Sequence, residues 1–425
     1  MPHPSAYRVY LGMVGATGFF FWTWAAMSAL YRIRDVGLNP LQLVLVGTAL
    51  EVSAFVFEIP TGVVADTVSR RVSIILGTAV MGVGFALEGA VPEFSVVLLA
   101  QVIWGLGFTF TSGATEAWLA DELQDDVATA RALLRGTQIR QFASLAGIVA
   151  AVALASVDLA APLIVGGIGY LLVAVALIMF MPETGFDRVP EAERDTWHDM
   201  QATLGHGIAL VRGSRVLLAV FGAAFFFGAF SETFDRLWEA LILANFEFPS
   251  FPDWSVIVWF GVIDASALLL SIFVAGVVRR RITAGTIVHI PAVLTGLALM
   301  LSATVVGLGL AGQFAVAVAL YQAAILLRVV HGPLLTAWLN EQLESRSRAT
   351  VFSMQSQSDA LGQVAGGPIL GWIATAVSLS VAFVMAGVFL MPAVLLYAWA
   401  ARRDRQDRAL LAPPHEDGGH SPDEA

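Results

Sequence analysis

Residues 161–181 read APLIVGGIGYLLVAVALIMFM, a run of 21 residues without a charged side chain. A helix needs about 20 predominantly apolar residues to cross the hydrocarbon core of a bilayer. This run therefore predicts a transmembrane helix. Eleven further runs of similar character lie at 9–31, 41–65, 72–91, 94–119, 137–157, 215–243, 254–278, 285–309, 312–338, 351–375 and 378–401. We expect an all-α membrane protein with twelve transmembrane helices.

The composition of the whole chain excludes several classes of protein. Of its 425 residues, 57% are hydrophobic and 13% charged, whereas soluble domains carry about a quarter charged residues. The net charge of −10 argues against nucleic-acid binding, which needs clustered cations. Cysteine and lysine are both absent, which removes thiolate chemistry, thiolate metal sites, Schiff bases and P-loops. We expect no cofactor, no metal and no nucleic-acid partner.

Arginine placement predicts the orientation in the membrane. If the N-terminus is inside, every even-numbered connection is cytoplasmic, and the arginines gather there, with Arg8 and the tail on the same side. The arginines of these connections are Arg70, Arg71, Arg131, Arg135, Arg140, Arg188, Arg194, Arg212, Arg215, Arg279, Arg280, Arg281, Arg346 and Arg348. Arg32 and Arg34 fall in an outer connection. Because positive residues favour the cytoplasmic side, we expect a multi-pass protein of the plasma (inner) membrane with both termini in the cytoplasm.

One long connection divides the twelve spans into two sets of six. Residues 182–214 are rich in charged side chains and predict a cytoplasmic linker that contains a surface helix. The linker separates an N-terminal half, residues 1–181, from a C-terminal half, residues 215–401. The tail at 402–425 combines proline, glycine and acidic residues, a composition typical of disorder.

The two halves share a pattern of residues at intervals of about 206 to 220 positions. Glu51 in the second span matches Asp264 in the eighth. The sequence AWLADE at 117–122 matches AWLNEQ at 337–342. Six-helix halves related by an axis along the membrane normal are a known plan for membrane proteins, so we expect the two halves to be pseudo-symmetric.

The loop between the second and third spans carries the most specific motif. Residues 62–71 read GVVADTVSRR. They resemble the signature Gly-x-x-x-Asp-x-x-Gly-Arg-Arg/Lys of the major facilitator superfamily, and with the twelve-span plan the resemblance covers residues 7–401. Two positions depart from the signature, because Ser69 replaces its second glycine and Thr67 an often basic residue. The resemblance implies a transporter whose halves rock about a central site.

The resemblance also implies a cytoplasmic gate. In the family this loop holds the two halves together in the outward-facing state. The charged residues of the loop are therefore assigned to the gate, together with acids at the end of the fourth span and a glycine that lets neighbouring helices approach. These expected gate residues are Gly62, Asp66, Arg70, Arg71, Glu116, Asp121 and Glu122.

Several predicted spans contain ionisable residues, which cost about 2.5–3.5 kcal/mol each at the centre of a membrane helix. Such residues normally face the interior of the bundle and often mark a transport pathway. We interpret Glu51, Glu58 and Asp264 as proton carriers or cation-binding carboxylates, with structural hydrogen bonding between helices as the alternative. Asp264 or Asp359 could neutralise Arg328, and we interpret Arg328 with Asp359 as a pair, either structural or substrate-binding.

Aromatic residues are dense in the first, fourth, seventh and tenth spans, where the family places its cavity. The expected cavity aromatics are Phe21, Trp24, Trp104, Phe108, Phe227 and Trp238. Together with the excess of acids they suggest an amphipathic, cationic substrate held by stacking and cation–π contacts. Packing or lipid contact is the alternative for each ring.

These features predict a monomeric secondary transporter in the lipid bilayer that exports small amphipathic molecules, drugs or metabolites, in exchange for protons by alternating access. Gln101, counted with the proton and substrate site, stands where proton-coupled members of the family often carry arginine. The alternative is therefore uptake or facilitated diffusion of a polar metabolite. A non-transporting sensor is a third possibility. We expect no enzyme, because His-Glu-x-x-His and Gly-x-Ser-x-Gly motifs are absent.

Overall fold

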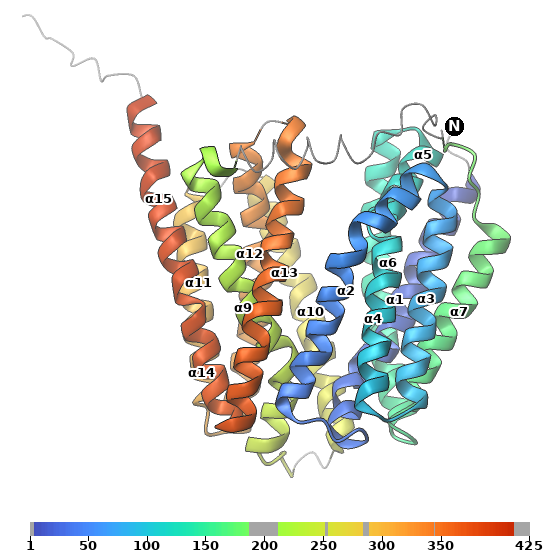
Figure 1. The fold of residues 1–425 in the computed structure, drawn as a ribbon, viewed down its shortest axis with the longest axis horizontal. Helices are drawn as coiled ribbons and strands as arrows, with labels where there is room; N and C mark the ends of the chain where they lie inside the picture. The colour runs from blue at the N-terminus through green and yellow to red at the C-terminus, as the bar shows by residue number, and fades with distance from the viewer. Residues whose placement is uncertain (1–3, 187–210, 251–253, 284–288, 344, 412–425) are drawn as a thin grey trace, which may run out of the picture.

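The computed structural model describes residues 4–186, 211–250, 254–283, 289–343 and 345–411, and within these ranges the regular structure is α-helical (Figure 1). The first helices are α1 (Pro4–Arg34), α2 (Pro40–Thr67), α3 (Arg70–Ala90), α4 (Phe94–Thr111), α5 (Ala114–Leu123), α6 (Asp126–Ala155) and α7 (Ala161–Phe180). After residue 210 come α9 (Arg215–Asn245), α10 (Val256–Thr283), α11 (Ile290–Gly309), α12 (Phe314–Gln342), α13 (Ser345–Ala376), α14 (Leu379–Phe389) and α15 (Met391–Leu411).

Eleven helical stretches of the described residues are long and apolar enough to cross a membrane. Two of them join helices, since α4 continues into α5 and α14 into α15. The expected span at 351–375 is not among the eleven. It lies in α13, which has 32 residues and is long enough, but carries serine, glutamine and aspartate along its first half. It packs against α2, α9 and α14 inside the bundle, where polar side chains need not face lipid.

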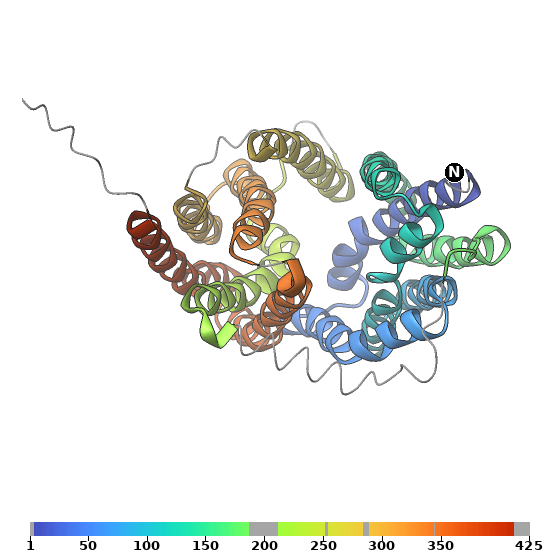
Figure 2. The same ribbon diagram turned by 90° about the horizontal axis from the view of Figure 1, so that it is seen from above.

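Most helix contacts fall within two groups, which lie side by side in Figures 1 and 2. In the first group α1 packs on α6 and α7, and α3 on α4 and α7. In the second, α9 packs on α13, α14 and α15, and α11 on α12, α14 and α15. The groups meet where α2 contacts α13 and α9, and where α6 and α1 contact α10.

Both ends of the described chain lie at one end of the bundle, which we call the terminal face (Figure 1). This face also carries α5 and the start of α3. The other end, where α1 ends and α2 begins, is called the opposite face.

Side-chain caps explain where several helices begin. The Ser69 hydroxyl accepts the Val72 amide at 3.0 Å and starts α3 directly after the loop motif. Asp125 accepts the Val127 and Ala128 amides and starts α6. The helix therefore begins at residue 126 rather than at 137, and Arg140 lies near its middle, not in a cytoplasmic connection.

The C-terminal helix also extends beyond its expected end. Residues 402–411 continue α15, although the sequence assigned them to a disordered tail. They contain arginine, alanine, leucine and glutamine, which favour helices, and the first proline after residue 402 is Pro413. The rest of the expected tail, and most of the expected linker with its surface helix, lie outside the described residues.

Candidate functional site

A cavity of about 570 Å³, the central cavity, lies where the two groups of helices meet. Helices α2, α4, α9, α12, α13 and α15 line it. Its ionisable and amide side chains are Glu51, Glu58, His331, Gln355, Gln357, Asp359 and Gln363. Its aromatic side chains are Phe55, Phe108, Phe227 and Tyr397. It therefore offers both charge and apolar surface to a ligand.

Three carboxylates from α2 and α13 face this cavity. Glu58 accepts a hydrogen bond from the Gln357 amide, and Asp359 accepts one from the Gln363 amide at 2.8 Å. Glu51 is half-buried, and Arg236 is the charged group with the largest electrostatic effect on it. Within the described residues none of the three lies within ion-pair distance of a cation.

The expected pairing of Arg328 with Asp359 is wrong. The Arg328 guanidinium donates to both carboxylate oxygens of Asp235, at 2.5 and 2.8 Å, and lies over the rings of Phe230 and Phe234. Asp235 on α9 presents both oxygens to the fork of the guanidinium, which favours this bidentate geometry. Asp359 is left with an amide partner and remains a free carboxylate in the central cavity.

A second ion pair lies at the contact between α2 and α9. Arg236 donates to Glu232 at 3.2 Å, and Glu232 is almost fully buried. Gly47 of α2 packs directly against both side chains, because a Cβ atom there would overlap them. Gly367 of α13 also packs on the Glu232 side chain.

These pairs and the cavity acids form one set, which we call the central charge network. Its members are Glu51, Glu232, Asp235, Arg236, Arg328 and Asp359. The network joins α2, α9, α12 and α13. It contains four carboxylates and two guanidinium groups, so its acids exceed its bases.

Glu51, Glu58 and Asp359 line the central cavity, whereas the other expected proton-site residues, Arg328, Asp264 and Gln101, do not. Asp264 of α10 is half-buried and interacts electrostatically with Glu239 and Tyr321. Gln101 is buried and donates to the Glu88 carboxylate at 3.1 Å.

Glu88 is fully buried and pairs with Arg32 at 2.6 Å. Its partner comes from α1, a helix distant in sequence, and no local pattern indicated the pair.

Four of the six expected aromatics line a cavity. Phe227 lines the central cavity. Phe21 and Trp104 line a second cavity of about 450 Å³, the side cavity, which is lined by α1, α3, α4, α5, α6 and α7. Phe108 lines both.

Trp24 and Trp238 line neither cavity. Trp24 stacks on Phe85 with ring centroids 4.3 Å apart, and Trp238 stacks on Tyr321 at 4.1 Å. Both tryptophans are buried, 2% and 5% exposed. Each serves to pack its own group of helices.

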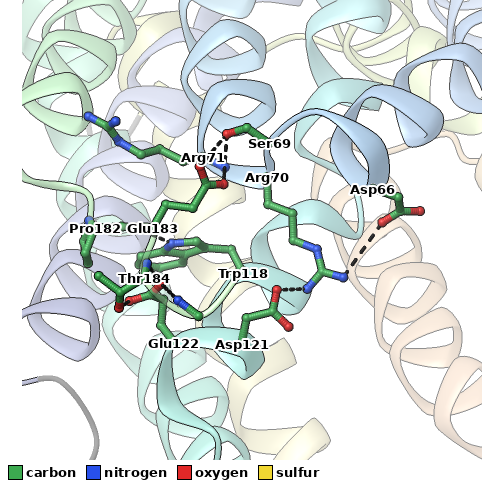
Figure 3. Close-up of polar contacts among 11 residues, drawn as sticks. Asp66, Ser69, Arg70, Arg71, Trp118, Asp121, Glu122, Pro182, Glu183 and Thr184 are labelled. Carbon is green, nitrogen blue, oxygen red and sulfur yellow. Dashed lines mark hydrogen bonds and ion pairs between the residues drawn. The ribbon is translucent and has the colours of Figure 1, made fainter. Parts of the chain in front are cut away.

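The charged loop residues form a cluster at the terminal face (Figure 3). Arg70 makes an ion pair with Asp121 and lies 3.9 Å from Asp66. Arg71 points elsewhere and donates to the Ile178 carbonyl at 2.6 Å. The start of α3 is thereby tied to the ends of α5 and α7.

Residues 182–186 complete this cluster, although the sequence assigned them to the linker. Glu183 accepts the Ser69 hydroxyl at 2.7 Å and the Arg71 amide at 2.9 Å, so a carboxylate lies at the N-terminus of α3 (Figure 3). Glu122 accepts hydrogen bonds from the backbone amides of Thr184 and Gly185. In the sequence, only the acidic residue Glu183, shortly after the sixth predicted span, could have indicated this contact.

Gly62 and Glu116 stand outside the cluster. No atom lies within 4 Å of a Cβ built on Gly62, so the expected close helix approach does not occur there. Glu116 is exposed and makes no hydrogen bond or ion pair among the described residues. The polar contacts of the other residues expected in the gate, within the part of the chain that the structure describes, stay inside residues 66–186.

Sequence reasoning missed the amides and the phenol of the central cavity. Gln357 and Gln363 hold the cavity carboxylates, and Tyr397 meets His331 at 3.1 Å. Glutamine recurs within the predicted span at 351–375, and this repetition of a polar residue could have indicated that the span lines a polar cavity. Tyr397 lies in an otherwise apolar segment, and nothing in the sequence around it indicated a place in the cavity.

Comparison with known proteins agrees with this architecture. The Major Facilitator Superfamily model matches residues 9–332. The uncharacterized MFS-type transporter YxaM of Bacillus subtilis (strain 168) is 24% identical over 361 residues, covering 84% of this chain and 86% of that protein.

Solved transporters share the fold. A bacterial homologue of the human lysosomal transporter Spinster, inward-facing and unoccupied, superposes with a TM-score of 0.75 at 16% identity, covering 96% of this chain and 99% of that one. A mutant of the nucleoside transporter NupG gives 0.74 at 12% identity, covering 93% and 99%. A POT family transporter in complex with a thioalcohol-conjugated peptide gives 0.75 at 13% identity, covering 94% and 97%. This chain therefore belongs to the Major Facilitator Superfamily, and it is a membrane transporter rather than an enzyme.

Proposed function

We propose that this chain is a proton-coupled secondary transporter that exports small amphipathic molecules. The observation that carries the proposal is the central cavity, in which Glu51, Glu58 and Asp359 lie without a cation partner among the described residues. Unpaired carboxylates at membrane depth are costly. The cost falls when they hold a proton, so the acids of this cavity are suited to taking up and releasing protons during transport.

The architecture behind this proposal has twelve transmembrane helices in two pseudo-symmetric halves, residues 1–181 and 215–401. We count α13 as the twelfth span, because its 32 residues are long enough and its polar face lies against α2 and α9. The proposed movement is a rocking of the halves about the contacts of α2 with α13 and α9.

The proposed orientation places the terminal face in the cytoplasm of a plasma-membrane protein. The arginine-rich connections support it. The lining residues of the central cavity lie in the parts of α9 and α12 nearer the terminal face. The Glu232–Arg236 pair and Gly47 pack on the other side of the cavity. In this orientation the described conformation is inward-facing.

The gate cluster supports the same assignment. In the outward-facing state we expect Asp66, Arg70 and Asp121 to meet the second half at the terminal face. Their described contacts stay within the first half, as an open inner gate requires. Residues 182–186, which follow α7, hold the cluster in place by hydrogen bonds to the start of α3 and to Glu122.

Uptake of a polar metabolite is the second candidate. The amides Gln355, Gln357 and Gln363 favour it, because they give the central cavity hydrogen-bonding capacity that an apolar drug would leave unused. A nucleoside transporter and a peptide-bound transporter are among the proteins of this fold. The proposed substrate is in either case a small molecule.

A growth-inhibition screen separates the two candidates. Cells that express the chain are challenged with drugs of different classes, alongside cells that express the Asp359→Asn variant. Export predicts resistance to a set of amphipathic compounds that the variant loses. Increased sensitivity to polar antimetabolites, with no resistance to any amphipathic compound, would favour uptake and contradict export.

A further inference from the structure

The side cavity holds a single charged group. Arg140 of α6 lines it, and no carboxylate is among the lining residues. The Arg140 side chain is exposed, and within the described residues no acidic oxygen lies within the 4.0 Å ion-pair distance. Glu116 and Arg140 both act electrostatically on Tyr10, yet no ion pair joins the two.

The position of Arg140 makes this isolation significant. Residue 140 lies three positions inside the apolar run at 137–157 and lines the side cavity. A cation within an apolar span is costly unless a counter-charge or water compensates it. A neighbouring acid would be the usual solution, and the described part of the chain supplies none.

The remaining hydroxyl groups of the side cavity are already engaged as donors. Each hydroxyl donates to a backbone carbonyl, and the donors are Thr17, Thr78, Thr111, Thr115, Ser144 and Tyr170. The Arg140 guanidinium is therefore the charged donor that this cavity offers to a ligand. Guanidinium groups bind carboxylates and phosphates with paired hydrogen bonds.

Aromatic rings form another wall of the side cavity. Phe21 contacts Trp22 and Trp104, with ring centroids 6.3 and 6.1 Å apart. Phe108 lines both the side cavity and the central cavity, so the two spaces adjoin at this ring. The volume of about 450 Å³ suits a small organic molecule.

We propose that the side cavity binds the anionic end of an amphipathic substrate, a carboxylate or phosphate on Arg140, with the apolar body of the molecule against Phe21, Trp104 and Phe108. This inference rests on the proposed function, which it narrows to amphipathic anions. It replaces the cationic substrate that the aromatic residues suggested in the sequence. The acids of the central cavity then serve the proton rather than the substrate.

Binding of two matched probes tests the proposal. The full-length protein in phosphatidylcholine nanodiscs is titrated calorimetrically with 4-phenylbutyrate and with its uncharged amide. We expect the wild type to bind the carboxylate at least about tenfold more tightly, because a hydrogen bond to a charged group contributes roughly 1.5–3 kcal/mol. Arg140→Gln is expected to abolish this preference, and Arg140→Lys to restore part of it.

Arg135→Gln is the matched control, since Arg135 lies on the same helix, does not line the side cavity and contacts Gln138. It should leave the preference unchanged. Thermal unfolding of each variant checks that the fold persists. Equal binding of acid and amide to the wild type, no binding of either, or a preference that survives Arg140→Gln would overturn the proposal. The titration uses no gradient, so a carboxylate preference without transport in liposomes would contradict the proposed function alone.

Discussion

Gly47 of α2 lies directly against the Glu232 carboxylate of α9, so that a single methyl group at this position would overlap both Glu232 and Arg236. The two helices belong to different groups, and their contact lies on the opposite-face side of the central cavity. The absence of a side chain at Gly47 therefore lets the two groups close around a buried ion pair.

Gly47→Ala should disfavour the described conformation. Overpacking of this kind costs typically 1–3 kcal/mol, which the protein can relieve by separating α2 from α9. We expect a cysteine introduced near Glu232 to react faster with a membrane-impermeant thiol reagent from the opposite face. Gly12→Ala, where no atom lies within 4 Å of the added carbon, is the control. Equal labelling in both variants would show that Gly47 has no part in closure.

The Arg328–Asp235 pair should couple α12 to α9 in a double-mutant cycle. With Arg328→Gln, Asp235→Asn and the double variant, we expect a coupling energy of about 1–3 kcal/mol in thermal unfolding. The same cycle with Asp359→Asn in place of Asp235→Asn should give close to zero, because Asp359 bonds to Gln363 instead. A larger coupling with Asp359 would restore the pairing expected from the sequence.

The buried Arg32–Glu88 pair should be structural. Removing one partner of a buried ion pair costs roughly 3–5 kcal/mol, so Arg32→Gln is expected to lower the unfolding temperature strongly. Arg34 lies two residues away and its side chain is exposed, so Arg34→Gln should change the unfolding temperature little. The measurement is thermal unfolding in detergent, and equal shifts for the two variants would contradict the assignment.

Ser69 and Glu183 should act together at the start of α3. Ser69→Ala removes both the helix cap and the hydroxyl donor to Glu183, and caps contribute about 1 kcal/mol. We expect Glu183→Gln to add less to Ser69→Ala than it costs alone, because their shared hydrogen bond is already lost. Additive losses of unfolding free energy would indicate that the two residues act independently.

The sequence predicts features that depend on neighbouring residues, and it does not predict contacts between helices that are distant in the chain. Apolar runs are local, so the helices at 9–31 and 161–181 were predictable, as was the loop that holds Arg70. The partner of Arg328 depends on how α9 and α12 face each other, which no run encodes. Arg140 was placed in a connection because its helix begins with polar turns, capped by Asp125. The contacts of residues 182–186 with the charged cluster at the terminal face also could not be predicted without the fold.

Proton-coupled flux in proteoliposomes tests the central claim most directly. The compound to which the chain confers the greatest resistance is followed under an imposed pH gradient, with a protonophore as control. We expect the gradient to drive flux in the wild type and in Glu93→Gln, because Glu93 is an exposed acid outside the cavity. Glu51→Gln and Asp359→Asn should lose that dependence. A wild-type flux that ignores the gradient, or cavity variants that respond like the wild type, would contradict the central claim.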